Sequence, residues 1–196
     1  MKSSRTRKPQ ERTAITRERL LVAAGQVFAQ RGYEKAQLEE VANAAGFSKG
    51  ALYAHFKSKE ELFMALAKTK AASYQAKLRR TLDGAATREA KIAAFRNFYV
   101  DLATDREWAL VILEVKLFLT RNPKAQERLR KAEEALEDSI EASLIKLMGK
   151  SATVPAKALG GIVSALVVEA DMAPKSFTDR KIRTLLGSVF DTLLES

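Results

Sequence analysis

Cysteine is absent from this chain of 196 residues, and histidine occurs once, as His55. Without cysteine there are no disulfides, no thiolate nucleophile and no Cys-based zinc or iron–sulfur site. The single histidine excludes a multi-histidine metal site, and any catalytic triad would have to use His55. No spacing of carboxylates signals an acid–base pair. We therefore expect neither an enzyme nor a metalloprotein, with no cofactor.

Long apolar runs are missing as well. No segment approaches the roughly 18 consecutive apolar residues that a membrane-spanning helix needs. Residues 1–17 (MKSSRTRKPQERTAITR) are basic and polar, without the apolar stretch of a signal peptide or membrane anchor. We expect a soluble, cytoplasmic protein with no membrane partner.

Sustained alternation of apolar and polar residues, the mark of β-strands, is nearly absent. Apolar residues instead recur at helical spacing along the chain, and the four prolines stand at the edges of these segments. The sequence predicts an all-α protein with about nine helices, near residues 16–31, 38–45, 48–56, 58–83, 86–103, 105–121, 123–149, 155–172 and 178–195.

Acidic residues are too few to balance the basic ones. The chain has 34 Lys and Arg against 24 Asp and Glu, a net charge of +10. Residues 1–60 alone carry 12 basic and 6 acidic side chains, so the positive charge is densest there. Such a surplus favours polyanionic partners, nucleic acid first and an acidic membrane surface second.

Two short predicted helices, 38–45 and 48–56, are joined by a turn that contains Gly46. In the second of them, Leu52 and Phe56 lie four residues apart and are predicted to face the core. Short helices joined by such a turn are typical of a helix-turn-helix. The predicted segments are longer beyond this point. We expect three parts: a basic flexible arm at 1–15, a helix-turn-helix domain at 16–62, and a larger helical domain at 63–196.

The motifs of this region are GYE at 32–34, LEEVA at 38–42, AAGFSKGALY at 44–53 and HFKSKEEL at 55–62. Together they closely resemble the DNA-binding domain of the tetracycline-repressor (TetR) family, over about residues 15–65. The sequence departs from the family pattern at Ala36 and Gln37, where members usually place Thr or Ser near the start of the second helix. A hydroxyl contact to a DNA phosphate at this point is therefore in doubt.

The helix at 48–56 is the candidate reading helix. Ser48 is expected to cap it, and Gly50 to let its backbone approach DNA closely. Ala51 and Ala54 suit thymine methyl groups, and Tyr53 offers a hydrogen-bonding tip. The resemblance implies a backbone contact for His55. The predicted DNA-binding residues are Ser48, Lys49, Gly50, Ala51, Tyr53, Ala54, His55 and Lys59.

Charge and capping add to this picture. Lys49 and Lys59 are expected to meet phosphates, and Lys49 also has the reach for guanine O6 and N7. Ser58 and Glu61 have the spacing of a capping box at the start of the next helix.

The larger domain contains a segment, 108–119, that is apolar on nearly all sides, so we expect its helix to be central. The candidate effector-binding residues are Phe95, Phe98, Tyr99, Trp108, Glu114 and Phe118. Two interpretations stay open. The aromatic side chains either line a ligand cavity or belong to an ordinary core, and Glu114 is either a polar group in that cavity or part of a structural ion pair.

The last two predicted helices each carry an apolar stripe, with small residues beside the first. Glycine inside a helix costs about 1 kcal/mol relative to alanine, so a glycine pair there suggests close helix packing. In the resembled family these helices form a four-helix dimer interface. The candidate interface residues are Gly160, Gly161, Ser164, Ala165, Leu186, Val189 and Phe190; packing within one subunit is the alternative.

The leading hypothesis is a homodimeric transcriptional regulator that binds double-stranded operator DNA and responds to a small-molecule effector. A repressor released by that effector is its most specific form. The alternative is a basic protein that binds DNA or membrane surfaces without sequence preference.

Overall fold

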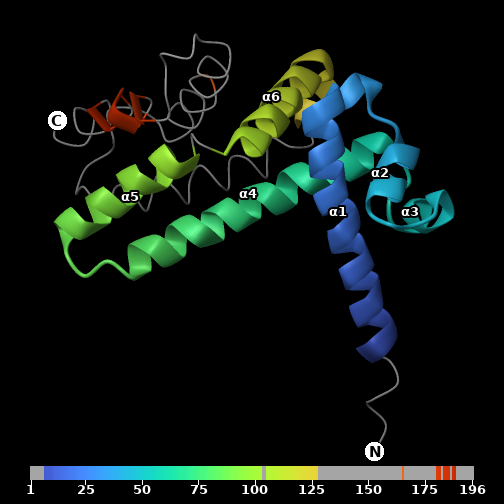
Figure 1. Ribbon diagram of the computed structural model, residues 1–196, viewed down its shortest axis with the longest axis horizontal. Coiled ribbons are helices and arrows are strands. Elements are labelled where there is room, and N and C mark those ends of the chain that lie inside the picture. The colour runs from blue at the N-terminus through green and yellow to red at the C-terminus, as the bar shows by residue number, and fades with distance from the viewer. Residues whose placement is uncertain are drawn as a thin grey trace, which may run out of the picture. The chain divides into compact units, whose positions relative to one another are not determined.

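The computed structural model describes residues 7–102, 105–127, 165, 180–181, 183–185 and 187–188. Throughout these residues the regular secondary structure is helical, without strands, which confirms the all-α class. The helices are α1 (Arg7–Lys35), α2 (Leu38–Ala44), α3 (Lys49–His55), α4 (Lys59–Asp83), α5 (Arg88–Leu102) and α6 (Arg106–Arg121) (Figure 1).

The bounds of α2 to α6 agree with the predicted segments to within two residues. Residues 123–127 begin a further helix at Pro123, where the amides of Ala125 and Gln126 donate to Asn122 O at 2.9 and 3.0 Å. Most of the segments 123–149, 155–172 and 178–195 lies outside the described residues. None of the helices in the described ranges has the length and apolar character to cross a bilayer.

The chain divides into two compact units, Met1–Ala72 and Ser73–Ser196, and the boundary falls inside α4. This boundary lies further along the chain than the one expected at 62–63. The reason is that α4 is one continuous helix, whose first residues pack into the core of the first unit.

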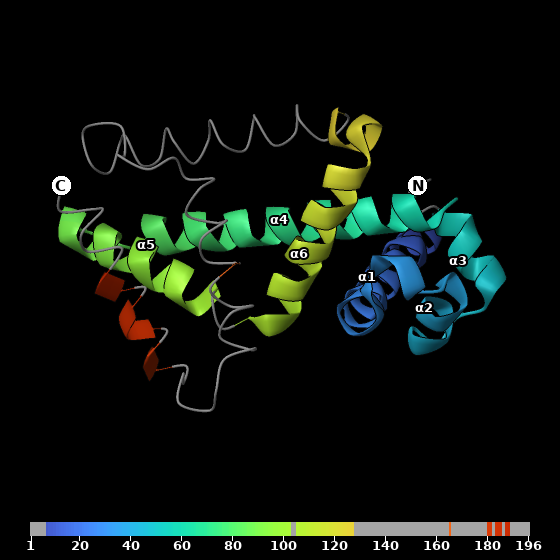
Figure 2. The same ribbon diagram turned by 90° about the horizontal axis from the view of Figure 1, so that it is seen from above.

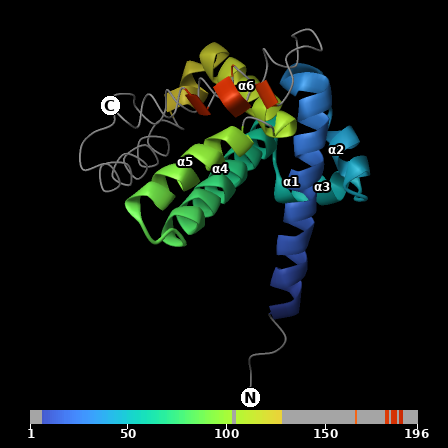
Figure 3. The same cartoon turned by 60° about the vertical axis from the view of Figure 1, so that its left-hand side comes forward.

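Helix α1 starts earlier than its apolar pattern indicated. It begins at Arg7, so residues 7–15, which the sequence assigned to a flexible arm, are helical. Side chains from Glu11 to Arg19 are exposed apart from a half-buried Thr16, and the N-terminal end of α1 projects past α2 and α3 (Figures 1 and 3). Arg, Lys, Gln and Glu favour helix, but a polar helix buries no face and leaves no periodic signal.

The regular turns of α1 end at Gly32, whose φ of 72° lies in the left-handed region. Glycine adopts this conformation without the steric cost that a Cβ would bring. The predicted end of the first helix at Arg31 is therefore confirmed. The chain continues through a short turn in which Ala36 N donates to Gly32 O at 3.2 Å.

The core of the first unit joins all four of its helices. An aromatic group links α1 to α4: the rings of Phe28 and Phe63 lie 4.9 Å apart edge to face, and Tyr33 lies 4.7 Å from Phe63. Such pairs add about 0.5–1.5 kcal/mol beyond the area they bury. The largest fully buried side chains here are Leu20, Phe28, Val41, Leu52, Phe56, Leu62, Phe63 and Leu66.

In the second unit, the C-terminal half of α4 and α5 run side by side in opposite directions (Figures 1 and 2). The Tyr74 hydroxyl of α4 donates to the carboxylate of Asp105, just before α6, and its ring lies 6.4 Å from Phe98. Helix α6 buries one face, which includes Val111, and leaves Leu117 40% exposed. The expectation that this helix is central is correct for the buried face and wrong for the outer face, where Lys116 is also exposed.

Tyr99 of α5 gives the second unit a measurable alkaline transition. Burial raises the pKa of its phenol from 10.0 to about 12. Between these pH values an unfolded chain releases the phenolic proton and the folded chain keeps it, so the free energy of unfolding falls as the pH rises. We expect Tyr99 to contribute about 2–3 kcal/mol to this fall. Denaturant titrations at pH 9 and pH 12 should show a smaller fall for Tyr99→Phe; an equal fall would contradict the prediction.

Candidate nucleic-acid interface

Helix α3 has one face in the core and the other in solvent. Leu52 is fully buried and Phe56, at the C-terminal cap, is 1% exposed. On the opposite side Lys49 and Ala54 are exposed and Tyr53 is 44% exposed. Gly50 is also exposed, whereas Ala51 and His55 are half-buried. The prediction that Leu52 and Phe56 face the core is confirmed, and His55 is less exposed than expected.

The start of α3 is open to solvent and capped as predicted. Ser48 Oγ accepts a hydrogen bond from Ala51 N at 3.2 Å, which satisfies one of the free amides of the first turn. A Cβ added at Gly50 would meet nothing nearer than Ser48 Oγ at 3.9 Å. Packing inside the protein therefore does not require glycine here. Close approach of a DNA backbone at Gly50 stays a prediction.

The turn between α2 and α3 closes with a Schellman motif at Gly46. Its φ is 74°, its amide donates to Asn43 O at 3.0 Å, and the Phe47 amide donates to Ala42 O at 2.9 Å. These bonds satisfy the last carbonyls of α2 and set the direction in which the chain enters α3.

Two arginines of α1 brace this arrangement, and sequence reasoning did not single them out. Arg19 Nη2 donates to Ala45 O at 3.1 Å, and its guanidinium lies 4.9 Å from the centre of the Phe47 ring. The Arg17 guanidinium lies 5.1 Å from the centre of the Phe56 ring. Arg19 is 26 residues away from its partner in sequence, so no local spacing predicts the contact.

Two glycine variants distinguish the structural role of the α2–α3 turn from the role of the reading surface, by which we mean the exposed residues Lys49, Gly50, Tyr53 and Ala54 of α3. Gly46→Ala forces a side chain into a left-handed conformation, which costs about 1–2 kcal/mol. Gly50→Ala places alanine in a helix and leaves stability unchanged or raises it by up to about 1 kcal/mol. Thermal unfolding measures both, and equal effects would contradict the role assigned to Gly46. We expect Gly50→Ala nevertheless to weaken DNA binding, because the predicted close approach of the DNA backbone leaves no room for the added methyl group.

Lys59, predicted to meet a phosphate, is already engaged within the protein. Its Nζ donates to Glu34 O at 3.0 Å and to Ala36 O at 3.2 Å, and it lies 4.8 Å from the centre of the Tyr33 ring. These two carbonyls, one in the last turn of α1 and one just after it, take two of its three donors. In this structure Lys59 fastens the start of α4 to the end of α1.

The start of α4 is capped in a modified form of the predicted box. Ser58 Oγ accepts from Glu61 N at 3.0 Å, as expected. The Glu61 carboxylate, however, accepts from Lys57 N at 2.8 Å, one residue before the position that a capping box uses.

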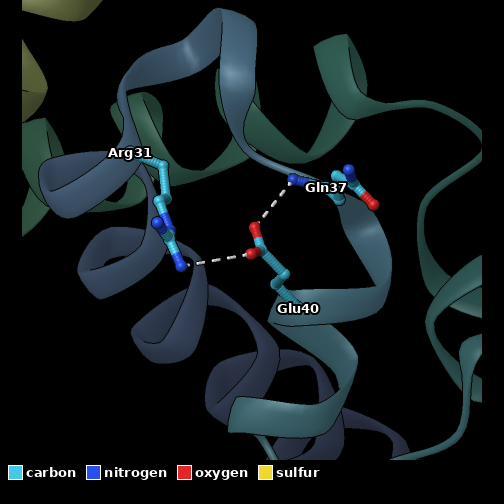
Figure 4. A network of polar contacts seen from close by, with 3 residues as sticks. All are labelled: Arg31, Gln37 and Glu40. Carbon is cyan, nitrogen blue, oxygen red and sulfur yellow. Dashed lines mark hydrogen bonds and ion pairs between the residues drawn. The ribbon is translucent and has the colours of Figure 1, made fainter.

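The start of α2 shows how the chain manages without a capping hydroxyl at Ala36 and Gln37. The Glu40 carboxylate accepts a hydrogen bond from Gln37 N at 3.2 Å and forms an ion pair with Arg31 at 3.6 Å (Figure 4). A carboxylate near a helix N-terminus also interacts favourably with the positive end of the helix dipole. Glu40 therefore supplies part of the stabilisation that a Ser or Thr cap gives.

Lys49 forms an ion pair with Glu39 of α2, and its Nζ lies 5.8 Å from the centre of the Tyr53 ring. The Lys49 ammonium donates a hydrogen bond to the Glu39 carboxylate. This hydrogen bond lowers the pKa of the Glu39 carboxyl group and raises the pKa of the Lys49 ammonium. Both groups are therefore charged at neutral pH. The reading surface carries a carboxylate that the sequence analysis did not include.

The candidate effector residues of the second unit gather in its interior. Phe95, Phe98, Tyr99 and Phe118 are all at least 93% buried, and the ring of Tyr99 lies 4.9 Å from that of Phe95 and 5.4 Å from that of Phe98. Glu114 is half-buried, and the side chain of Trp108 lies outside the described residues. These contacts are those of a packed aromatic cluster, and cavity lining stays a prediction.

Most of the candidate dimer interface falls outside the described residues. Ala165 is helical and exposed. Gly160, Gly161, Ser164, Leu186, Val189 and Phe190 are not described. Leu185, beside this set, is 43% exposed.

Residues 20–66, which span α2, α3 and the adjoining parts of α1 and α4, match the model of the family described as bacterial regulatory proteins, tetR family. The HTH-type transcriptional activator FasR of Mycolicibacterium smegmatis is 34% identical over 128 residues, 63% of this chain and 56% of FasR. The chain thus matches little more than half the length of this curated relative.

Solved structures resemble the chain over a greater length. A transcriptional regulator from Rhodococcus sp. Rha1 is 26% identical with a TM-score of 0.70, over 91% of this chain and 96% of that one. FadR of Bacillus subtilis, solved with stearoyl-CoA, shares the fold at 22% identity with a TM-score of 0.67, over 90% and 97% of the two chains. Residues 20–66 therefore match the helix-turn-helix domain of the tetR family of bacterial regulatory proteins, and the chain as a whole is similar to solved transcriptional regulators.

Proposed function

We propose that the protein is a homodimeric transcriptional regulator whose two α3 helices enter successive major grooves of operator DNA, and that a small molecule bound by the second unit releases it. The observation that carries this proposal is the orientation of α3: Leu52 and Phe56 hold it in the core, and Lys49 and Tyr53 point to solvent. A helix held in this way presents base-reading side chains without loss of the fold. In a dimer, two such helices about one helical turn of DNA apart read a palindromic site.

Effector binding is supported by the second unit and by one relative. FadR of Bacillus subtilis, which shares the fold, holds stearoyl-CoA. The aromatic cluster of Phe95, Phe98 and Tyr99 gives this chain an apolar interior in the same unit. A ligand that shifts the spacing of the two reading helices needs a coupling of only about 1–3 kcal/mol. Loss of operator binding on addition of the effector would make the protein a repressor wherever its operator overlaps a promoter.

Dimer formation rests on the apolar stripes of the last two predicted helices and on the exposed Leu185. Such stripes need a covering surface, and a two-fold axis provides one. Analytical ultracentrifugation at micromolar concentration should show a dimer, and a monomer would contradict this part of the proposal.

The competing function is binding of DNA through charge alone, which the basic surplus of residues 1–60 would also support. Selection of a binding site from random DNA, followed by salt titration on the selected and random sequences, separates the two. If a dimer neutralises about 6–10 phosphates, log K should fall with log salt at a slope of about −5 to −9. A sequence-specific regulator retains a preference for the selected site at about 150 mM salt, and a polycation does not.

The basic start of the chain should affect the salt dependence of DNA binding more than the preference for the selected site over random DNA. Replacing its cations by Gln keeps the helix-forming tendency of residues 7–12 and removes charge. We expect a slope flatter by about 0.9 for each phosphate that the protein no longer neutralises, with the preference for the selected site largely retained, because interactions with the DNA backbone carry little sequence information. A loss of preference without a change in slope would contradict this role. The residues replaced are Arg5, Arg7, Lys8 and Arg12.

A further inference from the structure

The surface around α3 holds an acidic side chain among its cations. Glu39 lies in the first turn of α2, and its carboxylate forms an ion pair with the Lys49 ammonium at the start of α3. The side chains of the pair are 46% and 55% exposed, so both remain accessible to a partner. Tyr53, one turn further along α3, lies beside Lys49. The pair therefore stands on the surface that we propose for operator binding.

The two adjacent glutamates of α2 have different contacts. Glu40 is directed to its own helix start, where it accepts from Gln37 N and pairs with Arg31 (Figure 4). The Glu39 carboxylate also accepts from its own backbone amide, and it reaches across the turn to the reading helix. Helix stability thus accounts for Glu40, whereas the ion pair of Glu39 joins α2 to a side chain of the reading surface.

An exposed ion pair contributes little to folding, since solvent screens the charges and both side chains lose freedom. Its effect on a polyanion is larger. Sequence-independent affinity depends on how many cations replace the counterions of DNA, and a lysine neutralised by a carboxylate replaces none. The carboxylate also repels nearby phosphates. The Glu39–Lys49 pair therefore weakens binding to DNA that offers phosphates alone.

We propose that Glu39 is a specificity-determining residue of the reading surface: it holds the Lys49 ammonium away from phosphates and keeps it available for base edges. This inference rests on the proposed function, because it presupposes that α3 meets DNA. The major-groove edge of a G·C pair suits the ion pair, since guanine O6 and N7 accept from a lysine and cytosine N4 donates to a carboxylate. Random DNA has no G·C pair fixed at this position. Its binding is therefore weakened by the carboxylate without the compensating hydrogen bonds to base edges.

Glu39→Gln tests the inference by removing the charge while keeping the shape of the side chain. Release of Lys49 adds one phosphate contact per subunit on random DNA, so the salt slope should steepen by about 0.9 per subunit. At about 0.15 M salt this corresponds to about a fivefold gain in affinity per subunit. The selected operator should gain less, because there Lys49 faces a base. The ratio of operator to random affinity should fall.

Glu18→Gln is the matched control, since it removes the same charge from an exposed position of α1. We expect it to leave the affinity ratio unchanged. A second comparison repeats Glu39→Gln in a Lys49→Met background, where no ammonium remains to be released. The gain on random DNA should then largely disappear.

The possible outcomes distinguish failure of the role of Glu39 from failure of the proposed DNA-binding function. A parent protein that prefers its selected operator, together with a Glu39→Gln variant of unchanged ratio, overturns the role of Glu39 alone. A gain of equal size in the Lys49→Met background also overturns it, because a general charge effect would then suffice. A parent protein without preference for any sequence overturns both the proposed function and this inference.

Discussion

Replacing Lys49 and Tyr53 together by alanine should abolish operator recognition and leave the fold intact. Both side chains lie on the exposed side of α3, and neither is part of the buried core. Each base-edge contact contributes a factor of about 5 to 150 in affinity, so the removal of two in each subunit should weaken binding by more than about a hundredfold. Electrophoretic mobility shift or fluorescence anisotropy with the selected operator measures it.

Controls for this variant come from the same chain. Lys116→Ala removes a cation from the exposed side of α6 and should leave operator binding unchanged. Tyr53→Phe retains the ring and removes only the hydroxyl, so it reports whether that hydroxyl donates to DNA. Circular dichroism should show the parent's helicity in every variant. If the double variant binds the operator as tightly as the parent, the reading surface lies elsewhere.

Leu52→Ala should instead destabilise the first unit. Leu52 is fully buried on the inner face of α3, and truncation of such a leucine removes its transfer free energy and leaves a cavity. We expect the free energy of unfolding to fall by about 2–5 kcal/mol. Urea titrations followed by circular dichroism measure this change at a fixed temperature.

Leu117→Ala is the matched comparison, because it makes the same change on α6 where the leucine is 40% exposed. Its cost should stay below about 1.5 kcal/mol, since only part of the side chain leaves an apolar environment. Equal costs at the two positions would show that α3 is not anchored through Leu52. Loss of DNA binding by Leu52→Ala at temperatures where it remains folded would indicate that the anchor also sets the position of the reading surface.

Much of the reading domain could be predicted because it depends on local rules. The spacing of Leu52 and Phe56 indicated the buried face of α3, since residues four apart share one side of a helix. Gly46 marked the end of α2, because its left-handed φ suits a residue without Cβ. Ser48 marked the start of α3, since its hydroxyl lies within reach of an amide three residues on.

Features without a local pattern were predicted less well. Residues 7–15 are helical, but the side chains of residues 11–15 are exposed and form no buried apolar face, so the sequence resembled that of an irregular arm. The packing of Phe95, Phe98 and Tyr99 also could not be predicted from the sequence, because aromatic residues at helical spacing suit both a core and a cavity.

The sequence by itself determined the all-α class, the helix-turn-helix and the face of α3 that is free to bind, because apolar periodicity and capping act over three or four residues. Only the tertiary structure decided what the long cationic side chains do. Lys59 donates to carbonyls 23 and 25 residues away, and Arg19 donates to one 26 residues away. Lys49 pairs with Glu39 across the turn. A lysine or arginine can reach several partners on flexible stems, and the packing of α1, α2 and α4 brings one of them within hydrogen-bonding distance.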